Sequence, residues 1–309
     1  MTEPRRRPVG RWASLLRLPT GAAPTFDLQG HSVHSDGALS AAAVVAAAAA
    51  AGVTLFALTD HDTTDGVGEA MEAAAQAGIR VVPATEISAS FGGRQDLHIL
   101  GYLVDPDQSA LVGALARSRH AREHRAEAMI DALTKLGFAV DREMLARRTA
   151  EGQSIGRPHL AQAVVSRPEN HDRLAAAGLL DPTAFLVAYL IEGRPAFVPR
   201  AAPTVAEAIE LIHGAGGLAV WAHPFWDIDA DRGVLEALEE FRAAGLDGVE
   251  AFYVTHSEAQ TRLLADRARA LGLLTTGSSD FHGPDHHTFS AFRAFHTYGL
   301  EPALGPLAG

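Results

Sequence analysis

Histidine, aspartate and glutamate side chains follow or interrupt short apolar runs along the whole chain. They offer nitrogen and oxygen donors, the atoms that hold divalent metal ions in hydrolytic enzymes. The sequence of 309 residues contains no cysteine, which excludes thiolate ligands and disulfides. This donor chemistry favours hydrolytic over redox metal chemistry. The expected ligands are His31, Asp36, His61, Glu86, His98, His223, Asp280 and His282.

The joint placement of these eight residues indicates a metal site, whereas any one of them alone has an ordinary structural explanation. Burying so many ionisable groups without a counter-charge would be very unfavourable. Each divalent ion takes about four to six ligands, and a carboxylate such as Glu86 or Asp280 can bridge two ions about 3.5–4 Å apart. The set therefore predicts a centre of two or three divalent ions, with Mn, Zn, Fe and Mg all suited to these donors.

The elements that must position these residues follow a repeating pattern from residue 25 onward. Ser40 is a suitable N-cap for an alanine-rich helix over 41–51, and the apolar run 53–58 that follows predicts a buried strand. A second helix over 66–77 and a strand over 79–84 repeat the pattern. Such alternation is typical of parallel strands with crossover helices, and in a parallel barrel the strand ends meet at one rim. Ligands far apart in sequence can converge there.

Helical patterns dominate between residues 106 and 200, and the alternation then resumes from 204 to 276. The sequence predicts an α/β protein in which 25–105 and 201–309 form a barrel and 106–200 form an inserted helical domain. Residues 1–24 contain five arginines and four prolines without a sustained period. We expect them to form a flexible basic tail and assign them no function.

The composition of the chain disfavours two classes of binding partner, DNA and membranes. The formal net charge of −11 disfavours a protein that binds DNA by neutralising its phosphates, so no specific DNA binding is expected. No stretch approaches the 18 or so consecutive apolar residues of a membrane helix. We expect a soluble, unexported, cytoplasmic protein that meets no membrane.

The order of the polar motifs resembles the PHP (polymerase and histidinol phosphatase) family over roughly residues 25–283. Within that family the chain is most similar to nucleoside 3′,5′-bisphosphate phosphatases and short-RNA 5′-exonucleases. The resemblance implies a distorted (β/α)7 TIM-like barrel, a site that commonly holds three metal ions, and the eight ligands named above. The motifs are Asp27-Leu-Gln-Gly-His31-Ser-Val-His-Ser35-Asp36-Gly37, Leu58-Thr-Asp-His61-Asp62-Thr, Pro83-Ala-Thr-Glu86-Ile-Ser, His98-Ile-Leu-Gly, Ala222-His223-Pro224 and Gly277-Ser-Ser-Asp280-Phe-His282.

The first motif departs from the family pattern. It usually begins His-x-His, and here Gln29 holds the first position. An amide oxygen can ligate a cation but binds zinc or iron more weakly than imidazole does. Gln29 is kept as a ninth candidate ligand, and the metal position that it serves is expected to be weak, altered or empty.

The inserted segment carries a second group of polar residues. Arg157 and His159 lie in Gly156-Arg157-Pro-His159, and Arg194 follows Tyr189 and Gly193. Similar stretches in the related phosphatases face the metal site and hold substrate phosphate, and arginine gives permanently charged, bidentate contacts to phosphate oxygens. The resemblance therefore implies substrate-binding roles for Arg157, His159 and Arg194.

These features predict hydrolysis of phosphate monoesters of small nucleotides, such as nucleoside 3′,5′-bisphosphate, by a metal-activated hydroxide. Asp36 and His223 are the candidates for catalytic proton transfer. Asp60 and Asp62 are expected to orient His61 rather than to bind metal.

Two alternatives remain, and a third is disfavoured by the absence of a residue that it needs. The chain could be a 5′-3′ exonuclease on short RNA, which uses the same chemistry on a longer substrate. It could be a phospho-ligand sensor with a degraded metal centre, for which Gln29 is the only support. A deaminase or amidohydrolase would need a metal-bridging lysine after the first motif, and the only lysine is Lys135, within the insertion.

Overall fold

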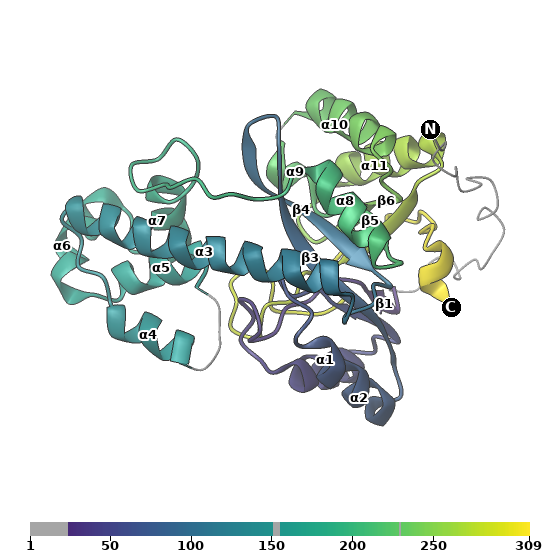
Figure 1. Ribbon diagram of the computed structural model, residues 1–309, viewed down its shortest axis with the longest axis horizontal. Coiled ribbons are helices and arrows are strands. Elements are labelled where there is room, and N and C mark those ends of the chain that lie inside the picture. The colour runs from purple at the N-terminus through teal and green to yellow at the C-terminus, as the bar shows by residue number, and fades with distance from the viewer. Residues whose placement is uncertain (1–23, 151–154, 229) are drawn as a thin grey trace.

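The computed structural model describes residues 24–150, 155–228 and 230–309. Within them, seven strands form one sheet whose spatial order follows the chain, so each strand pairs with the next (Figure 1). The strands are β1 (Phe26–Asp27), β2 (Leu55–Leu58), β3 (Arg80–Phe91), β4 (Arg94–Tyr102), β5 (Leu218–Trp221), β6 (Gly248–Tyr253) and β7 (Leu274–Ser278).

The two edges of this sheet approach each other. The backbone N–H of Leu28, just after β1, donates to the carbonyl of Gly277 on β7 at 3.1 Å. Gly30 and Phe281 form a further parallel bridge beyond the strand ends. The sheet is therefore a nearly closed barrel, and the predicted α/β, TIM-like fold with a helical insertion is confirmed.

One strand runs against the parallel pattern. β4 pairs antiparallel with both β3 and β5, whereas the other neighbouring strands pair in parallel. The long strand β3 makes this possible, because its first residues pair with β2 and its second half pairs with β4. The expectation that every strand presents its carboxyl end to one rim is thus wrong for β4. His98 reaches the rim from within a strand, directly across from Ser88.

Helices cover the outside of the barrel and begin where the sequence supplies caps. The Ser40 side chain accepts from the N–H of Ala43 at the start of the first helix, and Ser257 and Gln260 form a capping box on a later one. Gly272 ends that helix with φ of 67°, a left-handed conformation that favours glycine. These helices are α1 (Ala41–Ala50), α2 (Val67–Ala77), α8 (Val205–Gly214), α9 (Pro224–Asp227), α10 (Asp231–Ala243) and α11 (Glu258–Leu271).

The remaining α-helices lie in the predicted insertion and extend to one side of the barrel (Figure 1). They have a core of their own, built around residues such as Met129, Leu160 and Phe185. The long helix α3 joins the two bodies, since Leu111 near its start belongs to the barrel core. The helices are α3 (Ser109–Lys135), α4 (Arg142–Ala150), α5 (Arg157–Val165), α6 (His171–Ala177) and α7 (Pro182–Tyr189).

The expected basic tail of residues 1–24 falls almost entirely outside the described residues, which begin at Pro24. The exact boundaries at 105/106 and 200/201 stay a prediction. Within the described part of the chain, no helix combines the length and the apolar character needed to cross a membrane.

Candidate metal centre

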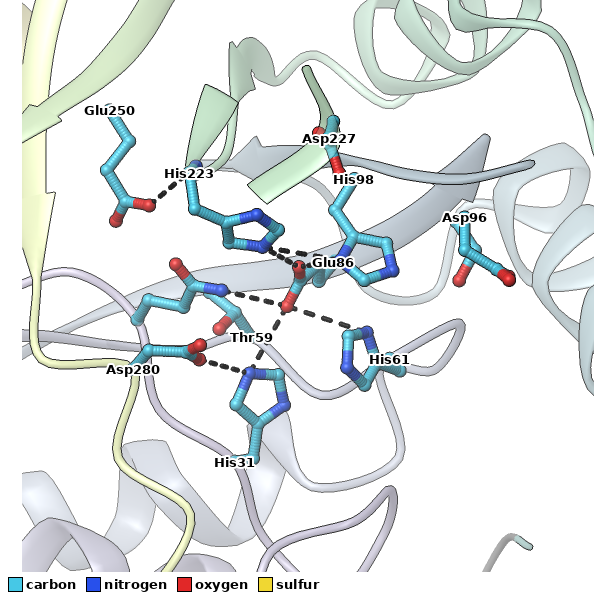
Figure 2. Close-up of polar contacts among 12 residues, drawn as sticks. His31, Thr59, His61, Glu86, Asp96, His98, His223, Asp227, Glu250 and Asp280 are labelled. Carbon is cyan, nitrogen blue, oxygen red and sulfur yellow. Dashed lines mark hydrogen bonds and ion pairs between the residues drawn. The ribbon is translucent and has the colours of Figure 1, made fainter. Parts of the chain in front are cut away.

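Glu86 is the centre of the site. Its Oε1 lies 2.8 Å from Nδ1 of His98 and 3.2 Å from Nε2 of His223. Its Oε2 lies 3.2 Å from Nε2 of His31 and 3.5 Å from Nδ1 of His61. Figure 2 shows these four imidazoles converging on the one buried carboxylate. A carboxylate whose two oxygens each face imidazoles has the arrangement expected of a ligand that bridges two metal ions.

Two further carboxylates extend the centre. Asp36 lies 3.6 Å from His31, 3.5 Å from His61 and 3.4 Å from His282, measured between side-chain oxygen and nitrogen atoms. Asp280 lies 3.0 Å from Nε2 of His31 on the other side. Three overlapping groups have ligand atoms close enough to share an ion. These are His31, Asp36, His61 and His282; His61, Glu86 and His98; and His31, Glu86 and Asp280.

The residues come from six places in the fold. Glu86 lies on β3 and His98 on β4, and loops after β1, β2, β5 and β7 supply the other six. Two of the loop residues have left-handed backbones, His223 with φ of 29° and Asp280 with φ of 53°. Side chains other than glycine rarely adopt this conformation, and such residues concentrate at functional sites. The local strain at these positions fits loops shaped to aim their side chains into the rim.

The donor atoms fit divalent cations. Among the described residues, Nε2 of His31, Nδ1 of His61 and Oδ1 of Asp280 are buried without a hydrogen-bond partner, although each faces other donors of the site. Buried polar atoms left unpaired are unfavourable, and a shared cation would satisfy all three. The atoms are nitrogens and carboxylate oxygens, which suit Mn, Zn, Fe or Mg.

Protonation also prepares the site for cations. Burial raises the pKa of Glu86, but the facing imidazoles of His61 and His98 outweigh it and hold that pKa well below its usual range. Burial likewise opposes ionisation of Asp36, yet His61 and His282 keep its pKa well below normal. Burial lowers the pKa of His61 to about 3. Two carboxylates are thus ionised and one imidazole is neutral at pH 7, the forms that bind metal. Burial would also lower the pKa of His31, His223 and His282, but the carboxylates that face them outweigh it and raise their pKa, so a cation would displace these protons on binding.

Gln29 lies beside the centre but faces it with its amide nitrogen. Its Nε2 donates to Oε2 of Glu86 at 3.0 Å, while its carbonyl oxygen lies 3.2 Å from the hydroxyl of Ser278. This arrangement directs the oxygen that could ligate a cation toward Ser278. A ligand role for Gln29 stays a prediction, and its visible contact is a hydrogen bond to Glu86.

The aspartates expected to orient His61 contact other groups. Asp60 accepts from the backbone N–H and hydroxyl of Ser32 and from the hydroxyl of Ser35, which fixes the loop carrying His31 and Asp36. Glu250, by contrast, accepts from the backbone N–H of His223 at 2.9 Å (Figure 2). Both carboxylates position ligand loops through the backbone.

A cluster of arginines lies next to the centre, and sequence reasoning found only one of its members. Arg122 on α3 contacts Asp62 at 2.6 Å and also donates to Ser88. The other contacts gather on Asp96, which lies 2.9 Å from Arg125, 3.3 Å from Arg157 and 3.2 Å from Arg200. Four guanidinium groups thus face two carboxylates and leave an excess of positive charge. We call Arg122, Arg125, Arg157 and Arg200 the arginine cluster.

The cluster joins the insertion to the barrel. Arg122 and Arg125 come from α3, Arg157 begins α5, and Arg200 lies just before the barrel resumes. Nη1 of the buried Arg200 has no hydrogen-bond partner within the described ranges. An excess of guanidinium with unused donors is the composition of an anion site. The sequence carries no signal for Arg122 and Arg200, because their contacts with Asp62 and Asp96 depend on how the insertion packs against the barrel.

The remaining predicted substrate residues differ in placement. His159 lies in the first turn of α5, and its Nδ1 accepts from the backbone N–H of Gly156 at 2.9 Å. Burial lowers the pKa of His159 to about 4, so the ring is neutral and carries its proton on Nε2. Arg194 is exposed in the segment after α7. No described side-chain contact ties it to the centre, and its role stays a prediction.

Comparison with known proteins gives consistent results. A family model described as "PHP domain" matches residues 27–162. A 3′,5′-nucleoside bisphosphate phosphatase of Chromobacterium violaceum is 35% identical over 283 residues, covering 91% of this chain and 94% of the relative. A 5′-3′ exoribonuclease of Haemophilus influenzae is 35% identical over 261 residues, covering 84% and 90%. A solved amidohydrolase from C. violaceum, with bound sulfate and no metal, superimposes with a TM-score of 0.77 at 32% identity, covering 92% and 93%.

Proposed function

We propose that this chain, which belongs to the PHP family and is a metal-dependent phosphoesterase, releases phosphate from small nucleotides such as nucleoside 3′,5′-bisphosphates. The observation that carries the proposal is the pairing of two neighbouring sites. The carboxylate of Glu86 faces four imidazoles, and the arginine cluster lies beside them with an excess of positive charge. A substrate with two phosphates could place one at each site.

We propose that two or three divalent cations, of Mn, Zn, Fe or Mg, occupy the centre. Bound cations would activate water as the nucleophile and neutralise charge that develops on the phosphate. Their number depends on whether Gln29 binds through its oxygen. The proposed ligands are His31, Asp36, His61, Glu86, His98, His223, Asp280 and His282, with Gln29 as the ninth candidate.

Two residues of the centre are proposed to handle protons. Asp36 is ionised at neutral pH, because His61 and His282 hold its pKa well below normal against the effect of burial. Burial would lower the pKa of His223, but its hydrogen bond to Glu86 raises that pKa to about 10. Asp36 is therefore suited to accept a proton. His223 is the candidate to donate one to the leaving oxygen where it does not bind a cation, because a ligating imidazole is neutral.

The second phosphate is proposed to bind between the insertion and the barrel. Arg157 is partly exposed, and among the described residues it contacts one oxygen of Asp96, which leaves other guanidinium donors for a substrate oxygen. The neutral His159 can donate from Nε2, as argued above. Burial would lower the pKa of Arg122, but Asp62 outweighs it and raises that pKa, with smaller contributions from Asp96 and Asp36, so the guanidinium stays charged. Hydrogen bonds from Arg157 and His159 would hold the phosphate that does not react.

The direct experiment is phosphate release from adenosine 3′,5′-bisphosphate by enzyme reconstituted with Mn²⁺, followed by analysis of bound metal. We expect one phosphate per substrate and a metal requirement that EDTA abolishes. A Glu86→Gln variant provides the inactive control, and Glu236→Gln, an exposed carboxylate on α10, provides the matched neutral one.

The 35% identical exoribonuclease makes short RNA the second candidate substrate. A 5′-phosphorylated RNA trimer separates the two. Stepwise release of mononucleotides faster than phosphate release from the bisphosphate would replace our proposal with the exonuclease. A full metal complement without turnover of either substrate would instead favour the phospho-ligand sensor. We propose a cytoplasmic location, where such nucleotides are found.

A further inference from the structure

An array of rings leads from the metal centre to the surface. The ring of His282 lies 5.4 Å from that of Phe289, and Phe289 lies 5.8 Å from Trp226, between centroids. His286 stacks on Phe289 at 5.0 Å with an interplanar angle of 22°. We call Trp226, His286 and Phe289 the aromatic platform. It joins α9 to the loop after β7, which carries two of the proposed ligands.

Hydrogen bonds hold the platform in place without any ligand. The backbone N–H of His282 donates to the carbonyl of Phe289 at 2.9 Å, which ties the platform to a proposed ligand. Nδ1 of His286 accepts from the backbone N–H of Phe289 at 3.0 Å. Nε1 of Trp226 donates to the hydroxyl of Thr255 at 2.9 Å. The rings are therefore preorganised, which reduces the entropy lost when a partner binds.

Trp226 is unusually exposed for its type. Its relative accessibility is 57%, and it is the only aromatic residue among the large apolar side chains that are exposed in the described part of the chain. Its indole N–H is already satisfied by Thr255, so what remains for a partner is the ring face. This open ring face adjoins Phe289 and His286 beside the proposed ligand His282, so the three rings together can receive a planar group.

We propose that the aromatic platform receives the nucleobase of the substrate by stacking. Every nucleobase has a π face, and stacking on an aromatic side chain favours binding by a base without reading its identity. A phosphate held near Asp36 and His282 would direct the rest of the nucleotide toward the neighbouring rings. The inference rests on the proposed nucleotide substrate, and it assigns the recognition of the base to Trp226, His286 and Phe289.

The kinetic test compares two substrates that differ only in the base. Adenosine 3′,5′-bisphosphate is measured against 1-O-methylribose 3,5-bisphosphate, which lacks it. For Trp226→Ala we expect KM for the adenosine substrate to rise about tenfold with kcat within about twofold, and no change for the base-free substrate. Trp226→Phe should restore most of the affinity. Met71→Ala, another exposed apolar side chain placed on α2, is the matched control and should match wild type.

A fluorescence titration keeps this inference separate from the proposed activity. Adenosine 5′-phosphate and adenosine 3′-phosphate, the two monophosphates left by loss of one phosphate, are added to wild type and to Trp226→Phe. Stacking on Trp226 should quench wild-type emission only, while Trp12 and the buried Trp221, which Trp226→Phe retains, serve as the internal reference. Quenching without any hydrolysis would retain the platform and overturn the proposed function. Hydrolysis with equal KM for both substrates, in wild type and Trp226→Ala alike, would overturn the platform and retain the function.

Discussion

The side-chain amide of Gln29 donates a hydrogen bond of 3.0 Å to the carboxylate of Glu86. Behind it, the hydroxyl of Ser278 lies 3.2 Å from Oε1 of Gln29 and 2.5 Å from Oε1 of Glu250. The Ser278 hydroxyl donates to Glu250, whose pKa burial raises to about 8. Together, the contacts of Gln29 with Ser278 and Glu86 hold its amide with the N–H toward Glu86.

The first prediction concerns the number of metal ions. Replacing Gln29 with His should supply the imidazole that the first motif lacks, and we expect bound metal to rise by about one ion per chain. Imidazole is a stronger ligand than an amide oxygen for zinc or iron. Gln29→Ala is the control, since it removes the bond to Glu86 and adds no ligand. Metal content is measured by elemental analysis after equilibration and gel filtration, and equal values for Gln29→His and wild type would refute the prediction.

The second prediction tests Glu86 as the shared ligand. Glu86→Gln preserves the shape of the side chain but removes the charge that faces four imidazoles. We expect the metal content to fall and phosphate release to drop at least about a hundredfold, more than the change of tenfold to a hundredfold typical of residues that only orient ligands. Elemental analysis and a phosphate assay measure both effects. A variant that keeps all its metal with near-normal turnover would contradict a bridging role.

Sequence reasoning recovered much of the fold because its periodic signals are local. The alanine-rich run after Ser40 forms α1, and the apolar run after Gly52 contains β2. The direction of β4 could not be predicted in this way, because an apolar run carries no information about strand polarity. That direction depends on β3, whose long second half forms an antiparallel pair with β4.

The sequence likewise predicted some residues of the candidate site and missed others. The proposed ligands follow apolar runs at recognisable motifs, so the resemblance to a family could point to them. Arg122 and Arg200 carry no such mark, because a single arginine on a polar helix or before a strand resembles a solvated surface residue. Only the packing of α3 against the barrel reveals that they face Asp62 and Asp96. The platform residue Trp226 was likewise invisible, since ring contacts across loops leave no pattern in sequence.

The third prediction concerns the second phosphate. Arg157→Ala should raise KM for adenosine 3′,5′-bisphosphate at least about tenfold and change kcat little, because charged hydrogen bonds to a non-reacting group contribute about 1.5–3 kcal/mol to binding. For an adenosine monophosphate the effect should be much smaller. Arg147→Ala, an exposed arginine on α4, is the control. Equal losses on both substrates would place Arg157 at the reacting phosphate instead, and the same assay on Arg194→Ala tests whether that exposed residue contributes at all.

The fourth prediction concerns stability and its dependence on pH. Asp96 is almost buried and faces Arg125, Arg157 and Arg200, so Asp96→Asn should leave guanidinium groups poorly compensated. Removing one partner of a buried ion pair costs about 3–5 kcal/mol, and because Asp62 remains nearby we expect about 3 kcal/mol in urea unfolding of the metal-free protein at pH 7. Asp131→Asn, which removes a partner from an exposed pair with Arg142, should change stability by less than about 1 kcal/mol.

The sign of the pH effect follows from the pKa of Asp96. Burial raises it, but Arg157, Arg125 and Arg200 outweigh burial and hold it well below the usual value of 3.8. The unfolded chain therefore binds a proton at a higher pH than the folded one does. The stability that Asp96 contributes is fully present above about pH 4 and is lost as the pH falls further. The difference in unfolding free energy between wild type and Asp96→Asn should thus stay constant from pH 7 to about 5 and narrow below pH 4. A difference that instead widened on acidification would mean that Asp96 is protonated more readily in the folded protein, contrary to its place among the arginines.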